Sequence, residues 1–531
     1  MPNDFSPSVL ISGGGPTGLT AALELRRFGI PVRIVDESEG PAATSRAVGI
    51  QARTLEEMEL RGLADEFVRL GHHATGGEIY GDGKLLAHVD FTRIPSRYNY
   101  LLFLSQTETD RILREALEAE GAAVEWGVRM SAFGQNPAGI TATLEHTDGS
   151  IEEVKAACVL DAEGAHSIIR DTLGLDFKGK TLDDTFVLGD VHIEANLPNS
   201  DFHIFSSELG FLGLFPMGGS HFRLIASHPP IDPGQSGAPT LGELQAIYDR
   251  RSHIAARLRQ LTWSSFFHIN SRMVEKLRVG RIFLAGDAAH IHSPAGAQGM
   301  NTGIQDAMNL GWKLALVLRG QASEALLDTY EQDRLPVMRS ILSRTEALTD
   351  VIGSRSMLRN LFVYLTPWIA GADFVQENAT ARISQIAFNY RNSPLSEEHF
   401  GDGSLAAGDR VPDVMVRAAS AGAPSPSQRL FTLLEPSRFT LLLANFADTA
   451  AIQARFSAAL SSRQDLFRIA QIMAPEGDAH APYAECFGSA PSLTLVRPDA
   501  YIGFRGGEAT AGDLVRYCNQ WLAPAAQKQA A

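Results

Sequence analysis

The first residues that could do chemistry are three glycines near the N-terminus, Gly13, Gly15 and Gly18, in the pattern Gly-x-Gly-x-x-Gly. A short apolar run precedes them at Val9–Ile11, and apolar residues recur at helical spacing from Leu19 onward. Glycines at this spacing allow a sharp turn and let a pyrophosphate approach the helix N-terminus, where N–H groups and the helix dipole favour negative charge. The motif therefore predicts a dinucleotide site.

An acidic residue after the next expected strand supports this prediction. Val32–Val35 alternates as a strand and ends in Asp36, which is placed to accept hydrogen bonds from an adenosine ribose. An acid at this position disfavours a 2′-phosphate, so the site favours FAD or NAD over NADP. Three neighbours join the expected cofactor-binding residues: Pro16, Thr17 and Glu37.

A second glycine-rich constellation follows another expected strand, at residues 281–286. The strand runs into Asp287, then into a glycine-rich loop that contains Gly299 and Met300, and a long helical pattern begins near Asn301. Asparagine is a good N-cap residue, and the dipole of the helix can stabilise an anion at the loop. The carboxylate of Asp287 could hold the hydroxyls of a polyol chain.

The composition sets the kind of scaffold that can position these motifs. The chain has 531 residues, of which 44% are hydrophobic and 20% charged, so we expect two or three packed domains rather than a disordered or fibrous chain. The net charge of −15 disfavours binding to nucleic acid or to anionic membrane surfaces. Three widely spaced cysteines without a C-x-x-C pair predict neither disulfides nor a metal site. With no signal peptide and no long apolar run, a cytoplasmic protein is expected.

Taken together, the two constellations resemble the group A flavoprotein monooxygenases, the single-component aromatic hydroxylases of the p-hydroxybenzoate hydroxylase and phenol hydroxylase type. The chain looks most similar to the phenol, halophenol and polyketide-tailoring hydroxylases. The resemblance spans residues 8–345 and rests on four strings: GGGPTGL at Gly13–Leu19, SRAVGIQARTLE at Ser45–Glu56, SQTETDRIL at Ser105–Leu113, and GDAAHIHSPAGAQGMNTGIQDAMNLGWKLA at Gly286–Ala315.

The resemblance implies an α/β fold with three parts. Residues 1–180 and 271–395 would form a Rossmann-like FAD-binding domain, and residues 181–270 an inserted mixed β-sheet domain for the substrate. Residues 400–531 would form a C-terminal thioredoxin-like α/β domain, which is expected to be redox-inactive because it lacks C-x-x-C. The oligomeric state is left open, with a homodimer among the alternatives.

The implied function is a monooxygenase that holds FAD non-covalently, takes electrons from NADPH or NADH, and uses molecular oxygen. It would hydroxylate a small phenolic or polycyclic aromatic substrate through a flavin C4a-hydroperoxide. A flavoprotein oxidase or dehydrogenase, or a non-aromatic monooxygenase on the same fold, remains an alternative. A flavin halogenase is disfavoured because the five tryptophans form no W-x-W pair.

The resemblance also assigns residues to the cofactor. Arg46 would lie over the pyrophosphate, Gln106 would touch the ribityl chain, and Asp287 would hold ribityl hydroxyls. Pro294 would place its backbone against flavin and substrate, and is counted with the catalytic residues. Backbone groups at the start of the long helix would meet the flavin pyrimidine edge: Gly299, Met300 and Asn301.

The chain departs from the family pattern at three positions. Glu163 replaces the aspartate of a family Asp-Gly pair, which flavin binding should tolerate and which leaves the nicotinamide preference open. Val48 and Phe205 stand where two family subgroups carry a base. His192 is taken as the acid/base group, with Asp190 and Tyr100 as alternatives, although a lone strand histidine more often has a structural role.

Phenylalanines recur along residues 181–270 and could line a dry substrate pocket or fill an ordinary sheet core. The expected substrate-binding residues are Phe205, Phe215 and Pro216.

Overall fold

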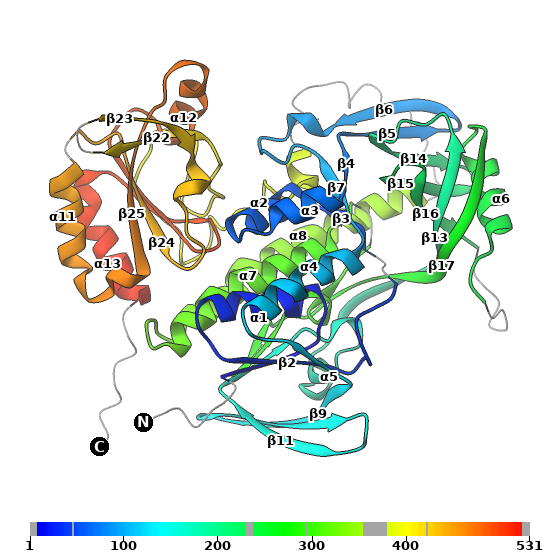
Figure 1. Ribbon diagram of the computed structural model, residues 1–531, viewed down its shortest axis with the longest axis horizontal. Coiled ribbons are helices and arrows are strands. Elements are labelled where there is room, and N and C mark those ends of the chain that lie inside the picture. Colours follow the sequence, from blue (N-terminus) through cyan, green and yellow to red (C-terminus); the bar gives the residue numbers. More distant parts are fainter. Residues whose placement is uncertain are drawn as a thin grey trace.

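The computed structural model describes residues 8–44, 47–229, 237–293, 296–353, 380–420, 423–447 and 449–522. Figure 1 shows the C-terminal strands and helices on the left, the bundle around α1 and α7 in the middle, and a large twisted sheet on the right. Among the described residues, no helix combines the length and apolarity needed to cross a membrane.

The glycine motifs sit on a six-stranded sheet of order β18-β19-β12-β1-β2-β8. β1 pairs in parallel with β2 and with β12, and β12 pairs in parallel with β19. The expected strand–turn–helix–strand unit is therefore confirmed. The strands are β1 (Val9–Ser12), β2 (Val32–Asp36), β8 (Val124–Trp126), β12 (Cys158–Asp161), β18 (Arg278–Val279) and β19 (Ile282–Leu284).

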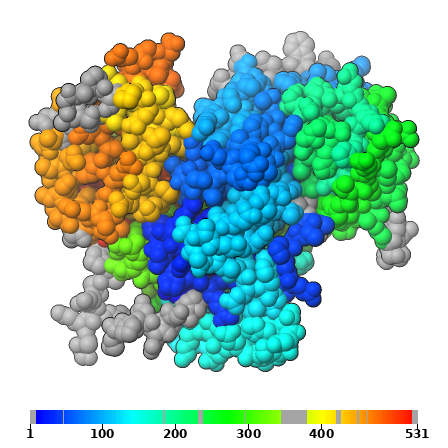
Figure 2. All heavy atoms as spheres, viewed as in Figure 1, coloured from blue at the N-terminus to red at the C-terminus, as the bar shows by residue number. Residues whose placement is uncertain are grey.

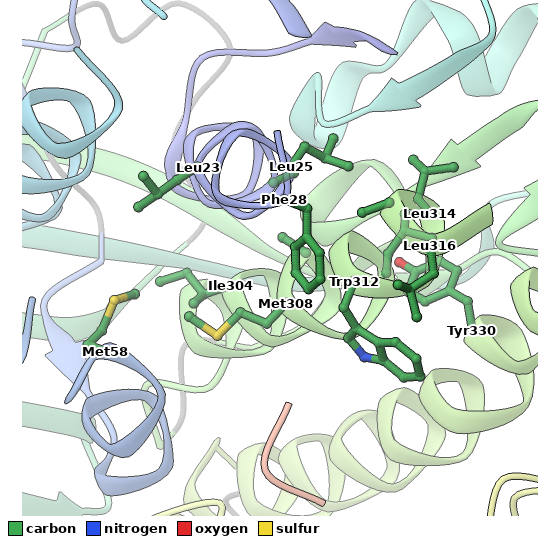
Figure 3. Packing of buried hydrophobic residues seen from close by; sticks show 14 of the residues in the cluster. Leu23, Leu25, Phe28, Met58, Ile304, Met308, Trp312, Leu314, Leu316 and Tyr330 are labelled. Atoms are coloured by element: carbon green, nitrogen blue, oxygen red, sulfur yellow. The ribbon is translucent and has the colours of Figure 1, made fainter. Parts of the chain in front are cut away.

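Two helices form the centre of this part, α1 (Pro16–Arg27) and α7 (Gly299–Leu318). Figure 3 shows Leu23 of α1 and Ile304 and Met308 of α7 among the side chains that pack between them, and all three are buried. Because α7 is buried along nearly its whole length, its N-terminus is held rigidly. The surrounding helices are α2 (Ala52–Leu60), α3 (Ala64–Leu70), α4 (Gln106–Ala119), α5 (Ile168–Thr172) and α8 (Ala325–Gly353).

The chain also forms two small antiparallel sheets. The first has the order β11-β10-β9 and the second β3-β7-β4. Their strands are β3 (Gly49–Ile50), β4 (His72–Ala74), β7 (Leu101–Phe103), β9 (Val128–Asn136), β10 (Gly139–His146) and β11 (Ile151–Ala156).

The large sheet has eight strands in the order β20-β17-β13-β16-β15-β14-β5-β6. Most come from the segment expected to form it, but β5 and β6 come from residues 76–90, and β5 pairs in parallel with β14. Helix α6 (Leu241–Arg251) packs on one face. The strands are β5 (Gly76–Gly81), β6 (Lys84–Asp90), β13 (Lys178–Ala195), β14 (Asp201–Ser207), β15 (Gly210–Gly218), β16 (His221–His228), β17 (Ala256–Met273) and β20 (His290–Ile291).

The C-terminal strands form a seven-stranded sheet of order β21-β27-β26-β24-β25-β22-β23. In its centre β24 and β25 are parallel, while β26 is antiparallel to both β24 and β27. Helices α11 (Thr449–Ala459), α12 (His480–Phe487) and α13 (Ala511–Leu522) lie between and after these strands in the chain. This is the thioredoxin-like arrangement that the resemblance implied. Figure 2 shows it in yellow and orange against the blue N-terminal part. The strands are β21 (Glu397–Glu398), β22 (Met415–Ser420), β23 (Ala423–Arg429), β24 (Phe439–Ala444), β25 (Phe467–Met473), β26 (Ser492–Val496) and β27 (Ile502–Gly506).

Candidate cofactor and active site

The first glycine motif forms a tight turn that two of its glycines make possible. Gly13 has φ +113°, and a side chain there would overlap the carbonyl oxygen of Ala162. A side chain on Gly18 would overlap the carbonyl oxygen of Gly13, whereas one on Gly15 would meet no atom within 4 Å. The turn is therefore closed on the protein side and open at Gly15, where α1 begins.

The carboxylate of Asp36 lies against this turn. Its Oδ2 accepts a hydrogen bond from the Gly14 N–H at 2.7 Å, and its Oδ1 accepts one from the Ser38 N–H at 2.8 Å. Asp36 is therefore held at the end of β2 beside the N-terminus of α1, as a ribose-binding acid must be. Glu37, the next residue, is exposed.

The two glycine-rich constellations meet at Thr17. A side chain on Gly286 would lie 2.5 Å from Thr17 Oγ1, and one on Gly303 would overlap the same atom. The hydroxyl of Thr17 thus fills the space between the loop after β19 and the first turns of α7. Pro16 occupies the first turn of α1, where its missing N–H is no loss.

The beginnings of α1 and α7 share a second property. Neither helix has a side-chain cap or an acidic residue in its first turn. The first turn of each helix therefore supplies no side chain that caps its backbone N–H groups or opposes the positive end of its dipole. Two such N-termini beside a glycine turn can hold an anionic dinucleotide.

A buried carboxylate, Asp306 of α7, holds the loop between β19 and α7 in place. Its Oδ2 accepts from the Gly286 N–H at 3.1 Å and lies 2.7 Å from His290 Nε2, and its Oδ1 accepts from Arg334 Nε at 2.7 Å. Burial alone would raise the pKa of Asp306, but the charges and hydrogen bonds of Arg334 and His290 lower it. The carboxylate thus stays ionised and fixes the loop.

Asn301 uses its side chain to tie α7 to the segment around β3. Its Oδ1 accepts from the Gln51 N–H at 2.9 Å, and its Nδ2 donates to the carbonyls of Gly49 and Ala297, both at 2.8 Å. Only its backbone is therefore left to meet a ligand. Gly299 and Met300 before it are half-buried.

Gln106 and Asp287 lie at the ends of elements in this region. Gln106 is the first residue of α4, is half-buried, and donates its backbone N–H to the Ala47 carbonyl at 3.1 Å. Burial raises the pKa of Asp110, one turn further along α4, to about 7, opposed by a hydrogen bond with the Gln106 side chain. Asp287 lies in the short turn Gly286–Ala288 and is exposed.

The carboxylate of Glu163 forms hydrogen bonds with groups of the protein itself. It accepts hydrogen bonds from Ser12 Oγ at 2.6 Å and from the N–H groups of Ile168 and Ile169 at 2.8 and 3.3 Å. Burial raises its pKa in spite of these donors. Its longer side chain therefore joins β1 to the start of α5, a contact that sequence reasoning did not anticipate.

The large sheet separates the expected substrate residues. Phe215 lies on the face toward the N-terminal part, with its ring 5.8 Å from Phe103 and 6.1 Å from Phe202. Phe205 lies on the opposite face, stacked on Tyr80 at 4.8 Å in the cluster beneath α6. Pro216 follows Phe215 and is buried on the α6 side, because alternate residues of a strand face opposite ways. The structure therefore does not bring Phe205 and Pro216 to the candidate site.

The three acid/base candidates differ in environment. Both oxygens of Asp190 accept from Arg223, at 2.8 Å each, so this carboxylate is neutralised. Tyr100 stacks on His73 at 4.2 Å, and burial raises its pKa to about 12. His192 is half-buried, and its Nδ1 lies 3.0 Å from Ser220 Oγ.

A residue that sequence reasoning missed lies beside His192. His221 is its cross-strand partner on β16, and their rings stack at 5.3 Å. Burial lowers the pKa of His221, and its Nε2 has no hydrogen-bond partner among the described residues. No local pattern could have revealed the pair, because it exists only through the register of β13 and β16. Arg46 and Pro294 lie outside the described residues.

Comparisons with known proteins match both parts of the chain. Residues 7–345 match the family model of an FAD binding domain, and residues 404–525 match that of the aromatic-ring hydroxylase C-terminal domain. The chain is 33% identical to 6-methylpretetramide 4-monooxygenase of Streptomyces rimosus, over 95% of this chain and 92% of the relative. It is also 33% identical to pentachlorophenol 4-monooxygenase of Sphingobium chlorophenolicum, over 96% and 95%.

A solved structure supports the same family. An aromatic hydroxylase from angucycline biosynthesis superimposes with a TM-score of 0.79 at 28% identity, over 98% of this chain and 100% of the other. The glycine turn, the carboxylate at Asp36 and the two uncapped helix N-termini at Thr17 are features that an FAD site requires. The chain therefore belongs to the family of FAD-dependent aromatic hydroxylases, the group A flavoprotein monooxygenases.

Proposed function

We propose that this enzyme holds FAD non-covalently and hydroxylates a phenolic or polycyclic aromatic substrate, with NADPH or NADH as transient electron donor and molecular oxygen as co-substrate. The observation that carries the proposal is the contact of Thr17 with Gly286 and Gly303, which unites the two glycine-rich constellations. The names of the relatives, a polyketide oxygenase and a chlorophenol oxygenase, support this substrate class.

Different residues of the site bind different parts of FAD. Gly13, Gly15 and Gly18 admit the pyrophosphate to the N-terminus of α1, and Asp36 accepts hydrogen bonds from the adenosine ribose. Asp287 and Gln106 hold the ribityl chain. The backbone of Gly299, Met300 and Asn301 meets the flavin ring. We assign Arg46 and Pro294 to the same site from the family pattern.

FAD, when bound, supplies the redox chemistry that activates oxygen. The protein supplies electrostatics and exclusion of water. The uncapped N-terminus of α7 stabilises negative charge on the flavin ring. The hydrogen bonds of Asp306 with the Gly286 N–H and of Asn301 with the Gly49 carbonyl hold this end of the helix in place.

The substrate lies against the face of the large sheet that carries Phe215 and Phe202. These rings, with Phe103 from the opposite side, provide an apolar wall that excludes water from the reacting atoms. On the same face of β13, Asp190 is neutralised by Arg223, which leaves His192 as the group that takes a proton from a phenol. His221 stacks on its ring from β16 and holds it in place.

The proposal is tested by the FAD content of the purified protein and by its NAD(P)H-dependent reaction with phenols. The purified protein should be yellow with one FAD per chain, and an accepted phenol should accelerate NAD(P)H oxidation and give a hydroxylated product. An oxidase would consume NAD(P)H and release peroxide with every aromatic compound tried. A protein that neither contains FAD nor takes it up would contradict the proposal outright.

A further inference from the structure

Four side chains of types that can bind a metal converge at the β14–β5–β6 edge of the large sheet. Glu78 lies on β5, and the register places His203 of β14 opposite it on one side and His88 of β6 opposite it on the other. Cross-strand partners project from the same face of a sheet. Asp201, two residues before His203, projects from that face as well.

Three of the four side chains approach closely enough to share one ion, and the fourth, His203, lies beside one of the three. One ligand atom each from Glu78, His88 and Asp201 lie within 4.8 Å of one another, and Glu78 Oε2 is 3.0 Å from His203 Nδ1. Gly76 makes this convergence possible. A side chain there would overlap Asp201 Oδ1 and would lie 2.7 Å from Cε1 of His88.

His203 shows that the group is built for a cation. It is completely buried, and its Nε2 lies 2.9 Å from the carbonyl oxygen of Pro198. Because a carbonyl can only accept, Nε2 carries a proton, and in the neutral ring Nδ1 has a lone pair. Nδ1 forms no hydrogen bond with any described residue, although it lies beside the Glu78 carboxylate.

Two facing lone pairs in a buried place repel each other unless a positive charge lies between them. A histidine that donates one ring N–H to a backbone carbonyl and offers its other nitrogen is the usual arrangement of a metal ligand. The hydroxyl of Tyr80 donates to Glu78 Oε2 at 2.5 Å, which orients that carboxylate in the same way.

We propose that Glu78, His88, Asp201 and His203 bind one divalent transition-metal ion, with zinc the best fit. Two imidazoles and two carboxylates suit the four-coordinate site that zinc prefers. Phe205, which follows His203 on the same face, packs beneath α6, so the site lies on the face opposite Phe215. The role of the ion is structural, because it links His88 of the edge strand β6 to Asp201 and His203 of β14.

The alternative occupant is a proton, with His203 as an imidazolium beside Glu78. A metal site and a protonated His203 are distinguished by titrating the FAD-loaded full chain with zinc chloride after dialysis against a chelator. Affinity is measured by competition with a chromogenic chelator, and the thermal unfolding temperature is recorded with and without zinc. We expect one zinc per chain and a higher unfolding temperature in its presence.

His88→Gln is the decisive variant, because His88 is exposed and its loss should not prevent folding. It should bind zinc at least about 100-fold more weakly and lose the thermal shift. His268→Gln, on exposed His268 of β17 in the same sheet, is the matched control and should bind like wild type. FAD content should be equal in all three proteins. A wild type without stoichiometric zinc at micromolar concentration, or an H88Q protein with wild-type affinity, would overturn the proposal.

Discussion

Replacing Asp306 by asparagine should destabilise the enzyme and weaken FAD binding together. The carboxylate is completely buried and is the only acidic partner that the described residues give to Arg334, which is also completely buried. Arg334 otherwise donates to neutral groups, the Tyr390 hydroxyl and the Thr302 carbonyl. Removing one charge of such a pair leaves the other uncompensated, which costs about 3–5 kcal/mol.

The FAD effect follows from the third partner of Asp306. The Gly286 N–H would lose a charged acceptor, and an asparagine cannot accept on both sides at once. The loop that adjoins Thr17 should therefore loosen. We expect the free energy of unfolding of the apoprotein in urea to fall by about 3–5 kcal/mol and the dissociation constant for FAD to rise at least about tenfold.

Asp328→Asn is the matched control. Asp328 lies on the same helix as Arg334 and pairs with Arg278 at 2.7 Å, but its side chain is 63% exposed. An exposed pair of this kind contributes less than about 1 kcal/mol. If Asp306→Asn lost no more stability than Asp328→Asn and retained FAD as tightly as wild type, the network would not be what fixes the Gly286 loop.

Three further predictions concern single groups. Asp287→Ala should weaken FAD binding by about 1.5–3 kcal/mol, because ribityl hydroxyls lose a charged acceptor, and equilibrium dialysis would reveal it. Burial lowers the pKa of His292 from 6.5 to about 3, so the unfolded chain binds the proton first and stability falls as pH drops below 6.5. Urea titrations should therefore show that His292→Gln loses about 2 kcal/mol less than wild type between about pH 7.5 and about pH 5. Replacing Cys486 and Cys518 by serine should leave coupled turnover within a few-fold of wild type, since burial raises the pKa of these thiols to about 11 and about 12 and keeps them unreactive.

Local patterns were sufficient for the parts of the site that are local. The turn at Gly13–Gly18 and the acid at Asp36 follow from spacing alone, because glycine conformation acts over a few residues. The helix expected to begin near Asn301 begins instead at Gly299, and its N-cap residue, Gln298, provides no side-chain cap. The resemblance added the thioredoxin-like C-terminal part.

Local patterns could not predict which strands pair when the strands are distant in the sequence. Strand alternation indicates that Phe205 and Phe215 belong to a sheet, but it does not tell which face of the sheet each ring covers, and the structure places the two rings on opposite faces. The contribution of β5 and β6 to the large sheet depends on the pairing of β5 with β14, more than a hundred residues away. For the same reason the cluster at Glu78 was not expected, since only the register brings its ligands together.

The most direct test of the central claim uses isotope-labelled oxygen gas with the FAD-loaded enzyme, NAD(P)H and a panel of phenols and polycyclic aromatics. If the two glycine constellations hold FAD beside the Phe215 face, at least one substrate should acquire one labelled oxygen atom for most of the NAD(P)H consumed. Without substrate, NAD(P)H oxidation should be slow and yield mainly peroxide. Peroxide alone across the whole panel, with no label in any product, would contradict the assignment and favour an oxidase.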